Sequence, residues 1–441
     1  MSEVKRWWCV WLSLDPAGAF NDRQTMHTLA QLKAGDLRGI THLALSEGLT
    51  EFPRDIFDLA DTLEILDLSG NALTTLPDDL YLLRRLRVLF ASNNRFTHLP
   101  KSIGQCAELS MVGFKTNRIT TVSPYALPPK LRWLILTDNA LTHLPDNIGQ
   151  CAHLQKLMLA GNRLSELPAM LANCRRLELL RIAANDLDTL PDWLFDLPRL
   201  SWLAFAGNPF SSEPAVSDAP GIAWTDIDLQ QVLGEGASGV IHRASLKGEP
   251  VAVKLFKGAV TSDGLPHSEM TACLHASVHP NLIPVRGRVR GAPQGQALVM
   301  ELIDPAYRVL AGPPSFDSCT RDIYAADTRF TAETARMIAR GIASAAAHLH
   351  AHGLLHGDLY AHNILHNGQG HALIGDFGAA SYYGTARPEL QRLDVRAFGC
   401  LLEELVQHSD ATDAVMIALR EACLSDTPVT RPLFAEIAEA L

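Results

Sequence analysis

The chain has 441 residues, a hydrophobic content of 47% and a net charge of −10. This length allows two or three domains that each bury a core, and the acidic balance argues against a general nucleic-acid binder, which needs a basic surface. No run of 18 apolar residues occurs, so the sequence predicts no transmembrane helix. The eight cysteines include no CxxC pair, which indicates a reduced, cytoplasmic protein without a structural zinc site.

Residues 1–39 are expected to form an N-terminal cap segment. Their short apolar run is rich in Trp and stops at Asp15, which is short for a signal peptide. We therefore expect this segment to pack against the first unit of an internal repeat, with secretion as the alternative.

An internal repeat dominates residues 40–210. Its consensus, LxxLxLxxNxLxxLP, predicts a short strand with inward leucines, then an Asn that satisfies backbone groups at the turn. The pattern resembles the leucine-rich repeat family, which implies a solenoid of about eight repeats. Successive copies are spaced by 23 residues, except for one unit of 22 residues. They begin at Ile40, Leu63, Leu86, Leu109, Leu131, Leu154, Leu177 and Leu200.

The strand positions between the inward leucines are expected to face outward on the concave side. Many of them are apolar, which favours a patch that docks a protein substrate, a regulator or a neighbouring domain. Scattered apolar residues on a solenoid are the alternative explanation. The positions predicted for partner contact are Phe90, Met111, Trp133, Ile135, Met158 and Trp202.

Residues 211–224 are rich in Pro, Ser, Gly and Ala and lack periodicity, so they are expected to link two domains. The sequence LGEGASGVIHRA follows, with glycines between two apolar runs. A helix after such glycines would indicate a dinucleotide-binding fold, whereas the β-rich continuation to VAVK indicates a hairpin. Further on, residues 331–352 form an alanine-rich helical pattern that Gly353 is expected to end.

The sequence HGDLYAHNILHNGQGHALIGDFG (356–378) contains oxygen-bearing side chains suited to phosphoryl transfer. Together with the glycine hairpin and VAVK, it resembles the protein kinase family over residues 225–441, which implies an N-lobe (225–303) and a C-lobe (304–441). The resemblance implies that Asp358 is the catalytic base, that Lys254 contacts phosphates and pairs with Glu269, and that Asn363 and Asp376 bind Mg²⁺.

The same resemblance implies an ATP site. Met300 matches the gatekeeper, and backbone groups at Glu301 and Ile303 are expected to bind adenine above Leu365. The remaining nucleotide-binding positions implied are Leu233, Gly234, Glu235, Gly236, Ser238, Gly239, Ile241 and Ala252.

Outside the reacting groups, Asp394 resembles the residue that braces the catalytic loop. Arg431 resembles the partner of Glu389, the residue that ends the activation segment (376–389). Two positions depart from the family pattern: Gly357 replaces an arginine, and Tyr360 replaces a lysine. The first departure suggests activity without phosphorylation of the activation segment, and the second blurs the choice between Ser/Thr and Tyr acceptors.

The sequence therefore predicts a multidomain fold, with a leucine-rich repeat solenoid (α/β) followed by a two-lobed α+β kinase-like domain. The predicted function is ATP- and Mg²⁺-dependent phosphorylation of Ser/Thr in a protein recruited by the repeats. A pseudokinase scaffold is the first alternative, supported by Tyr360. A small-molecule phosphotransferase is the second, because HGD also occurs in such enzymes.

Overall fold

The computed structural model describes residues 26–211, 213, 221–236, 238–258, 260–276, 278–293, 295–384 and 387–441. Much of the expected cap segment and most of the expected linker lie outside these ranges. The chain divides into two compact units. The repeat unit runs to Leu197 and includes Asn208–Phe210, and the C-terminal unit comprises Pro198–Gly207 and the chain from Ser211 to Leu441.

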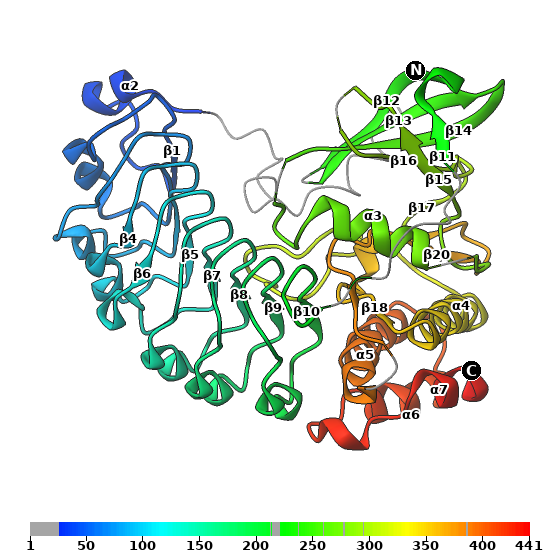
Figure 1. The fold of residues 1–441 in the computed structure, drawn as a ribbon. Coiled ribbons are helices and arrows are strands. Elements are labelled where there is room, and N and C mark those ends of the chain that lie inside the picture. Colours follow the sequence, from blue (N-terminus) through cyan, green and yellow to red (C-terminus); the bar gives the residue numbers. More distant parts are fainter. Residues whose placement is uncertain are drawn as a thin grey trace. The chain divides into compact units, whose positions relative to one another are not determined.

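The repeat unit contains one parallel sheet in which each repeat contributes a three-residue strand (Figure 1). The register is constant, so that Val88 pairs with Met111 and Met111 with Trp133. Seven of the sheet's eight strands lie in the repeat unit: β1 (His42–Ala44), β2 (Ile65–Asp67), β3 (Val88–Phe90), β5 (Met111–Gly113), β7 (Trp133–Ile135), β8 (Lys156–Met158) and β9 (Leu179–Arg181).

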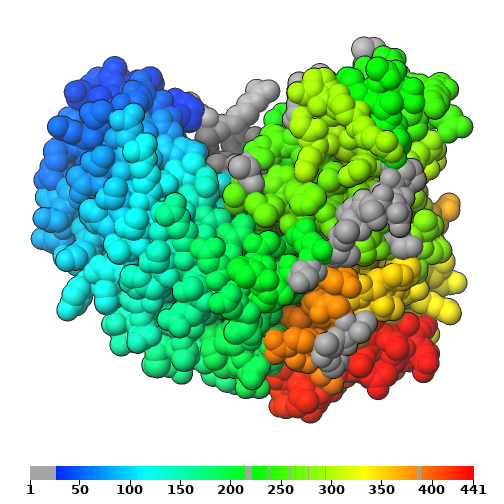
Figure 2. Space-filling model, viewed as in Figure 1, coloured from blue at the N-terminus to red at the C-terminus, as the bar shows by residue number. Residues whose placement is uncertain are grey.

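Short helical turns return the chain on the outer side of this sheet. A second parallel pair joins β4 (His98–Leu99) to β6 (Thr121–Val122). Successive copies follow one another in colour order from blue to green, as expected of a solenoid (Figure 2). Helix α2 (Leu29–Ala34) precedes β1. The returns are η2 (Arg54–Leu59), η3 (Leu80–Leu82), η4 (Lys101–Gln105), η5 (Pro124–Ala126), η6 (Asp146–Gln150), η7 (Ala169–Asn173) and η8 (Asp192–Asp196).

The predicted asparagine ladder is confirmed. Asn162 is typical: its Nδ2 donates to the carbonyls of Leu136 and Leu159, each at 2.9 Å, and its Oδ1 accepts from Leu141 N at 3.0 Å. Asn185 repeats this pattern one copy later. Each amide therefore satisfies backbone groups that would otherwise be buried without partners.

The residues predicted for partner contact are buried in the structure. Phe90, Met111, Trp133, Ile135 and Met158 are at most 6% exposed. Neighbouring strands pack their outward side chains on one another: Trp133 Nε1 lies 3.3 Å from the Met158 sulfur, and Lys156 Nζ lies 4.6 Å from the Trp133 ring centroid. The sixth predicted residue, Trp202, belongs to β10 (Trp202–Ala204) in the C-terminal unit.

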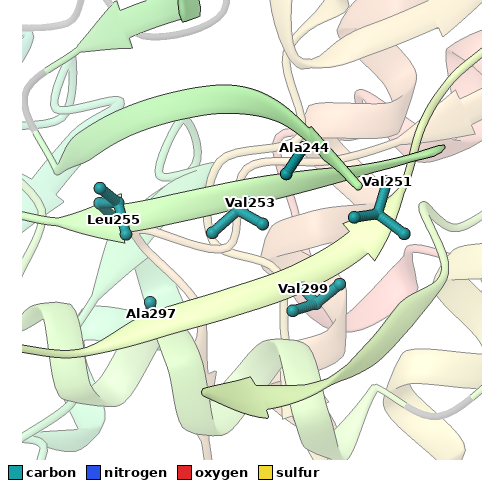
Figure 3. Close-up of a cluster of buried hydrophobic side chains, with 6 residues drawn as sticks. All are labelled: Ala244, Val251, Val253, Leu255, Ala297 and Val299. Atoms are coloured by element: carbon teal, nitrogen blue, oxygen red, sulfur yellow. The ribbon is translucent and has the colours of Figure 1, made fainter. Parts of the chain in front are cut away.

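The C-terminal unit begins with a six-stranded sheet in the order β11-β15-β16-β14-β13-β12. Apolar residues of its central strands form one cluster, which includes Val251, Val253 and Val299 (Figure 3). Helix α3 (Pro266–His275) follows β14 in the chain. The strands are β11 (Gly221–Ala223), β12 (Ile227–Gly236), β13 (Gly239–Leu246), β14 (Glu249–Phe256), β15 (Val285–Arg290) and β16 (Ala297–Glu301).

The rest of the C-terminal unit is mainly helical (Figure 1). Helix α4 (Ala332–Ala351) ends as predicted, because Gly353 follows with φ +69°. The other helices are α5 (Gln391–Gln407), α6 (Ala414–Cys423) and α7 (Phe434–Ala440), with short turns η9 (Trp224–Asp226), η10 (Ala361–Asn363), η11 (Pro388–Leu390) and η12 (Pro428–Thr430). The small strands are β17 (Arg308–Val309), β18 (Leu354–Leu355), β19 (Ile364–His366), β20 (Ala372–Ile374) and β21 (Ser381–Tyr382).

The predicted fold class, a repeat solenoid followed by a mixed-sheet, two-lobed domain, is confirmed. Across the described ranges, no helix has both the length and the apolar character required to span a membrane.

Replacing Asn162 with Ala should lower the free energy of unfolding by about 2–4 kcal/mol, because two buried carbonyls and one N–H lose their partner. Urea unfolding of the full chain measures this difference. Asn173→Ala is the matched control, since Asn173 is exposed at the end of η7. Equal losses for the two variants would contradict the role assigned to the ladder.

Candidate active site

Lys254 and Glu269 form a buried ion pair between β14 and α3. Lys254 Nζ donates to Glu269 Oε1, and both side chains are at most 7% exposed. Burial by itself would lower the pKa of Lys254, but the nearby carboxylates of Glu269 and Asp376 outweigh it and raise that pKa. The Lys254 side chain therefore stays positively charged although it is buried.

Asp358 and Asn363 belong to one tightly bonded loop. Asn363 Nδ2 donates to both the backbone carbonyl and the Oδ2 of Asp358, each at 2.9 Å. Gly375 N donates to the carbonyl of Asn363 at 3.1 Å, which ties this loop to the residue before Asp376. The three predicted oxygen-bearing residues are thus brought to one place.

Asp376 has an uncommon backbone conformation for a non-glycine residue, with φ +53°. Its Oδ1 accepts from Gly378 N at 3.1 Å, a local bond that stabilises the turn. Strain of this kind persists where surrounding contacts determine it, and it often marks functional positions.

The electrostatics around Asp376 suit a bound cation. Burial raises the pKa of Asp376 to about 7; the Lys254 ammonium opposes that rise, while the carboxylates of Glu269, Asp358 and Asp263 add to it. Over the described residues, no three His, Cys, Asp or Glu side chains are grouped as a metal site. The donor set of Asp376, Asn363 and Asp358 nevertheless fits Mg²⁺, which prefers a few protein oxygens together with water and phosphate oxygens.

Asp394 of α5 braces the catalytic loop, as predicted. Its Oδ2 accepts from His356 N at 2.8 Å and its Oδ1 from Gly357 N at 3.1 Å. By contrast, the predicted pairing of Arg431 with Glu389 is wrong. Glu389 Oε1 accepts from Arg387 Nε at 2.9 Å, whereas Arg431 donates to backbone carbonyls, including that of Ser425.

The residues predicted to surround adenine form one apolar cluster. Leu233, Ile241, Ala252 and Leu365 are its buried members, and Ile303 packs against it. Met300 also contacts the cluster. Glu301 differs, because its carboxylate binds Arg286 and its N–H donates to the carbonyl of Pro284. Only the carbonyl of Glu301 is therefore suited to contact a base.

The predicted glycine-rich hairpin is formed by β12 and β13. Gly236 pairs with Gly239, and Gly234 pairs with Ile241. A side chain at Gly239 would overlap the carbonyl oxygen of Leu255 in β14, so β13 and β14 approach there as closely as glycine permits. Glu235 points its carboxylate to Lys257 Nζ at 2.8 Å, and Ser238 is buried.

Sequence reasoning missed two groups beside the catalytic loop. Asp322 accepts from the backbone N and from Nδ1 of His362, both at 2.8 Å. Trp202 stacks on Tyr360 with ring centroids 4.0 Å apart and planes 4° apart. The tyrosine was visible as a departure from the kinase pattern, but its partner lies far away in the sequence.

Comparisons with known proteins agree with this geometry. Residues 227–397 match the protein kinase domain family, and residues 62–83, 129–187 and 152–210 match leucine-rich repeat families. The chain therefore carries leucine-rich repeats followed by a protein kinase domain.

Curated relatives support the same assignment for the C-terminal part. A serine/threonine-protein kinase, PkaA of Streptomyces coelicolor, is 29% identical over 221 residues, covering 40% of this chain and 38% of the relative. A lectin-domain receptor kinase of Oryza sativa is 28% identical, covering 42% of this chain and 26% of the relative. The chain thus spans well under half the length of these two relatives.

A solved leucine-rich repeat protein of Leptospira interrogans is also similar, with 25% sequence identity and a TM-score of 0.35. The match covers 41% of this chain and 53% of that one.

Replacing Asp394 with Ala should lower the free energy of unfolding by about 2–4 kcal/mol, since two buried backbone N–H groups lose their acceptor. Thermal unfolding of the full chain tests this expectation. Glu403→Ala on the same helix is the control and should change stability little, because Glu403 is half-buried and the catalytic-loop N–H groups at His356 and Gly357 bond to Asp394 instead. If the two variants unfolded at the same midpoint temperature, this result would argue against the role of Asp394 in bracing the catalytic loop.

Proposed function

We propose that this chain is a protein kinase that transfers the γ-phosphate of ATP to a Ser or Thr hydroxyl in an Mg²⁺-dependent reaction. The observation that carries the proposal is the convergence of Lys254, Glu269, Asp358, Asn363 and Asp376 from separate segments. These are the types of group that phosphoryl transfer requires: a cation for phosphates, a base for the hydroxyl and oxygen ligands for a metal.

Each residue has a role that follows from its surroundings. Asp358 Oδ2 is oriented by Asn363 Nδ2, so this carboxylate is placed to accept the proton of the acceptor hydroxyl. Lys254, held by Glu269, would contact the phosphates. Asn363 and Asp376 would hold Mg²⁺, which neutralises charge on the phosphates when bound.

The apolar cluster would receive adenine. Leu233 and Ile241 come from the glycine-rich hairpin, and Leu365 comes from β19 of the C-lobe. The Glu301 carbonyl and the Ile303 N–H would bind the edge of the base. A pseudokinase scaffold would need none of the buried carboxylates, whose desolvation is unfavourable unless they interact with cations.

The repeats would recruit the protein substrate or a regulator. This part of the proposal rests on the extended solenoid surface, because such surfaces commonly bind proteins. Beside the predicted strand positions, the surface would include other residues of the repeats. Tyr125, 76% exposed on η5, and Met170, 44% exposed on η7, are apolar groups available for contact.

Asp358→Asn and Lys254→Met should each reduce kcat by at least about 100-fold, because the base or the phosphate-binding cation is lost. Production of ADP and phosphoprotein with Mg²⁺ measures this. Asp228→Asn, at an exposed position of β12, is the control and should retain wild-type turnover. Undiminished transfer by the Asp358→Asn protein, with nucleotide bound, would refute the assignment.

Recruitment by the repeats predicts that a protein substrate has a kcat/KM at least about tenfold higher than a short peptide carrying the same acceptor residue, since remote binding energy contributes only in the protein. Steady-state kinetics with both substrates tests this. Similar values for protein and peptide would show that the kinase domain alone selects its substrate.

A further inference from the structure

The segment Pro198–Gly207 packs on the catalytic loop of its own unit. Trp202 lies parallel to Tyr360, with centroids 4.0 Å apart and an interplanar angle of 4°. Trp202 is 1% exposed and Tyr360 is 4% exposed. A stacked pair of buried aromatic rings stabilises the folded state by more than the burial of its apolar area alone. The residue two positions after Asp358 is therefore held by a residue from the last repeat copy.

The same segment also contacts the residue before Asp358. Gly357 has φ +71°, and a Cβ there would overlap the carbonyl oxygen of Leu203 and lie 2.9 Å from that of Ala379. No side chain fits at position 357 while Leu203 occupies this place. One segment thus contacts both departures from the kinase pattern, Gly357 and Tyr360.

A third contact reaches the activation segment. Ser381 Oγ accepts from Phe205 N at 2.9 Å and from Ala206 N at 3.2 Å, and Ser381 is 1% exposed. Ser381 also belongs to β21, which pairs with β18 immediately before the catalytic loop. The segment therefore connects the strand after Asp376 with the loop that carries Asp358.

The segment and the loop are both anchored on their far sides. Arg431, 2% exposed, donates from a terminal guanidinium nitrogen to the carbonyl of Pro198 at 2.7 Å. Beyond Tyr360, the ring of His362 follows at 4.9 Å, and Asp322 holds that histidine. The chain between Asp358 and Asn363 is consequently fixed from both directions.

We propose that Trp202 is a positioning residue for phosphoryl transfer, and that the segment Pro198–Gly207 is an integral part of the kinase domain. This inference rests on the proposed function. By contacting positions 357 and 360, on either side of Asp358, the segment fixes the catalytic carboxylate relative to Asp376. Errors of about 1 Å in such placement can reduce rates by about 100-fold.

The test compares full-length Trp202→Ala, Trp202→Phe and wild type with ATP, Mg²⁺ and one protein substrate. Trp202→Ala should lower kcat at least about tenfold, because Asp358 is no longer held. The KM for ATP should change less than about twofold, because the adenine cluster contains no residue of the segment. Trp202→Phe should recover most of the activity, since phenylalanine can still stack on Tyr360.

Two further variants keep the result interpretable. Trp193→Ala, at a half-buried position in η8, controls for loss of a tryptophan and should retain wild-type turnover. Ser381→Ala removes a single oxygen and should lower kcat in the same direction, which tests the proposal even if Trp202→Ala does not fold.

The outcomes are distinct. An unchanged or increased kcat in folded Trp202→Ala, or in Ser381→Ala if the former is unfolded, overturns the positioning role while the kinase assignment stands; an increase would show that the segment inhibits. A Trp202→Ala protein whose KM for ATP rises while its kcat is unchanged also overturns the positioning role. A wild-type chain that transfers no phosphate overturns the proposed function and this inference with it.

Discussion

The catalytic loop keeps its shape because residues outside the loop accept hydrogen bonds from its buried N–H groups and pack on its side chains. Its buried backbone N–H groups at His356 and Gly357 need acceptors, and both carboxylate oxygens of Asp394 supply them. Asp322 does the same for His362. Trp202 then covers Tyr360. Since Asp358 lies within this framework, the geometry of the reacting carboxylate depends on three separate parts of the C-terminal unit.

This framework has an electrostatic counterpart. Lys254, Glu269 and Asp376 are held together in a largely buried site, where an unpaired charge would be strongly unfavourable. The Lys254 ammonium partly balances the two carboxylates, while burial, together with the carboxylates nearby, raises the pKa of Asp376. A site with this balance favours divalent cations and the phosphates that accompany them, so the charge arrangement and the proposed reaction agree.

Much of the fold could be predicted from the sequence because its signals are periodic or local. The repeat spacing determined the strands and the asparagine ladder, and Asp358, Asn363 and Asp376 lie within one short stretch. Contacts between distant residues could not be predicted this way. Trp133 contacts Met158 of the neighbouring strand, Arg431 binds carbonyls rather than Glu389, and the partner of Tyr360 is Trp202.

Amide hydrogen exchange of the full chain measures whether the segment Pro198–Gly207 holds the catalytic loop. Exchange at residues 354–363 and 379–382 should be faster in Trp202→Ala than in wild type, because these backbone groups lose their support. Exchange in β14 should be unchanged. Equal protection of the catalytic loop in both proteins would show that the segment does not hold this loop, whatever their activities.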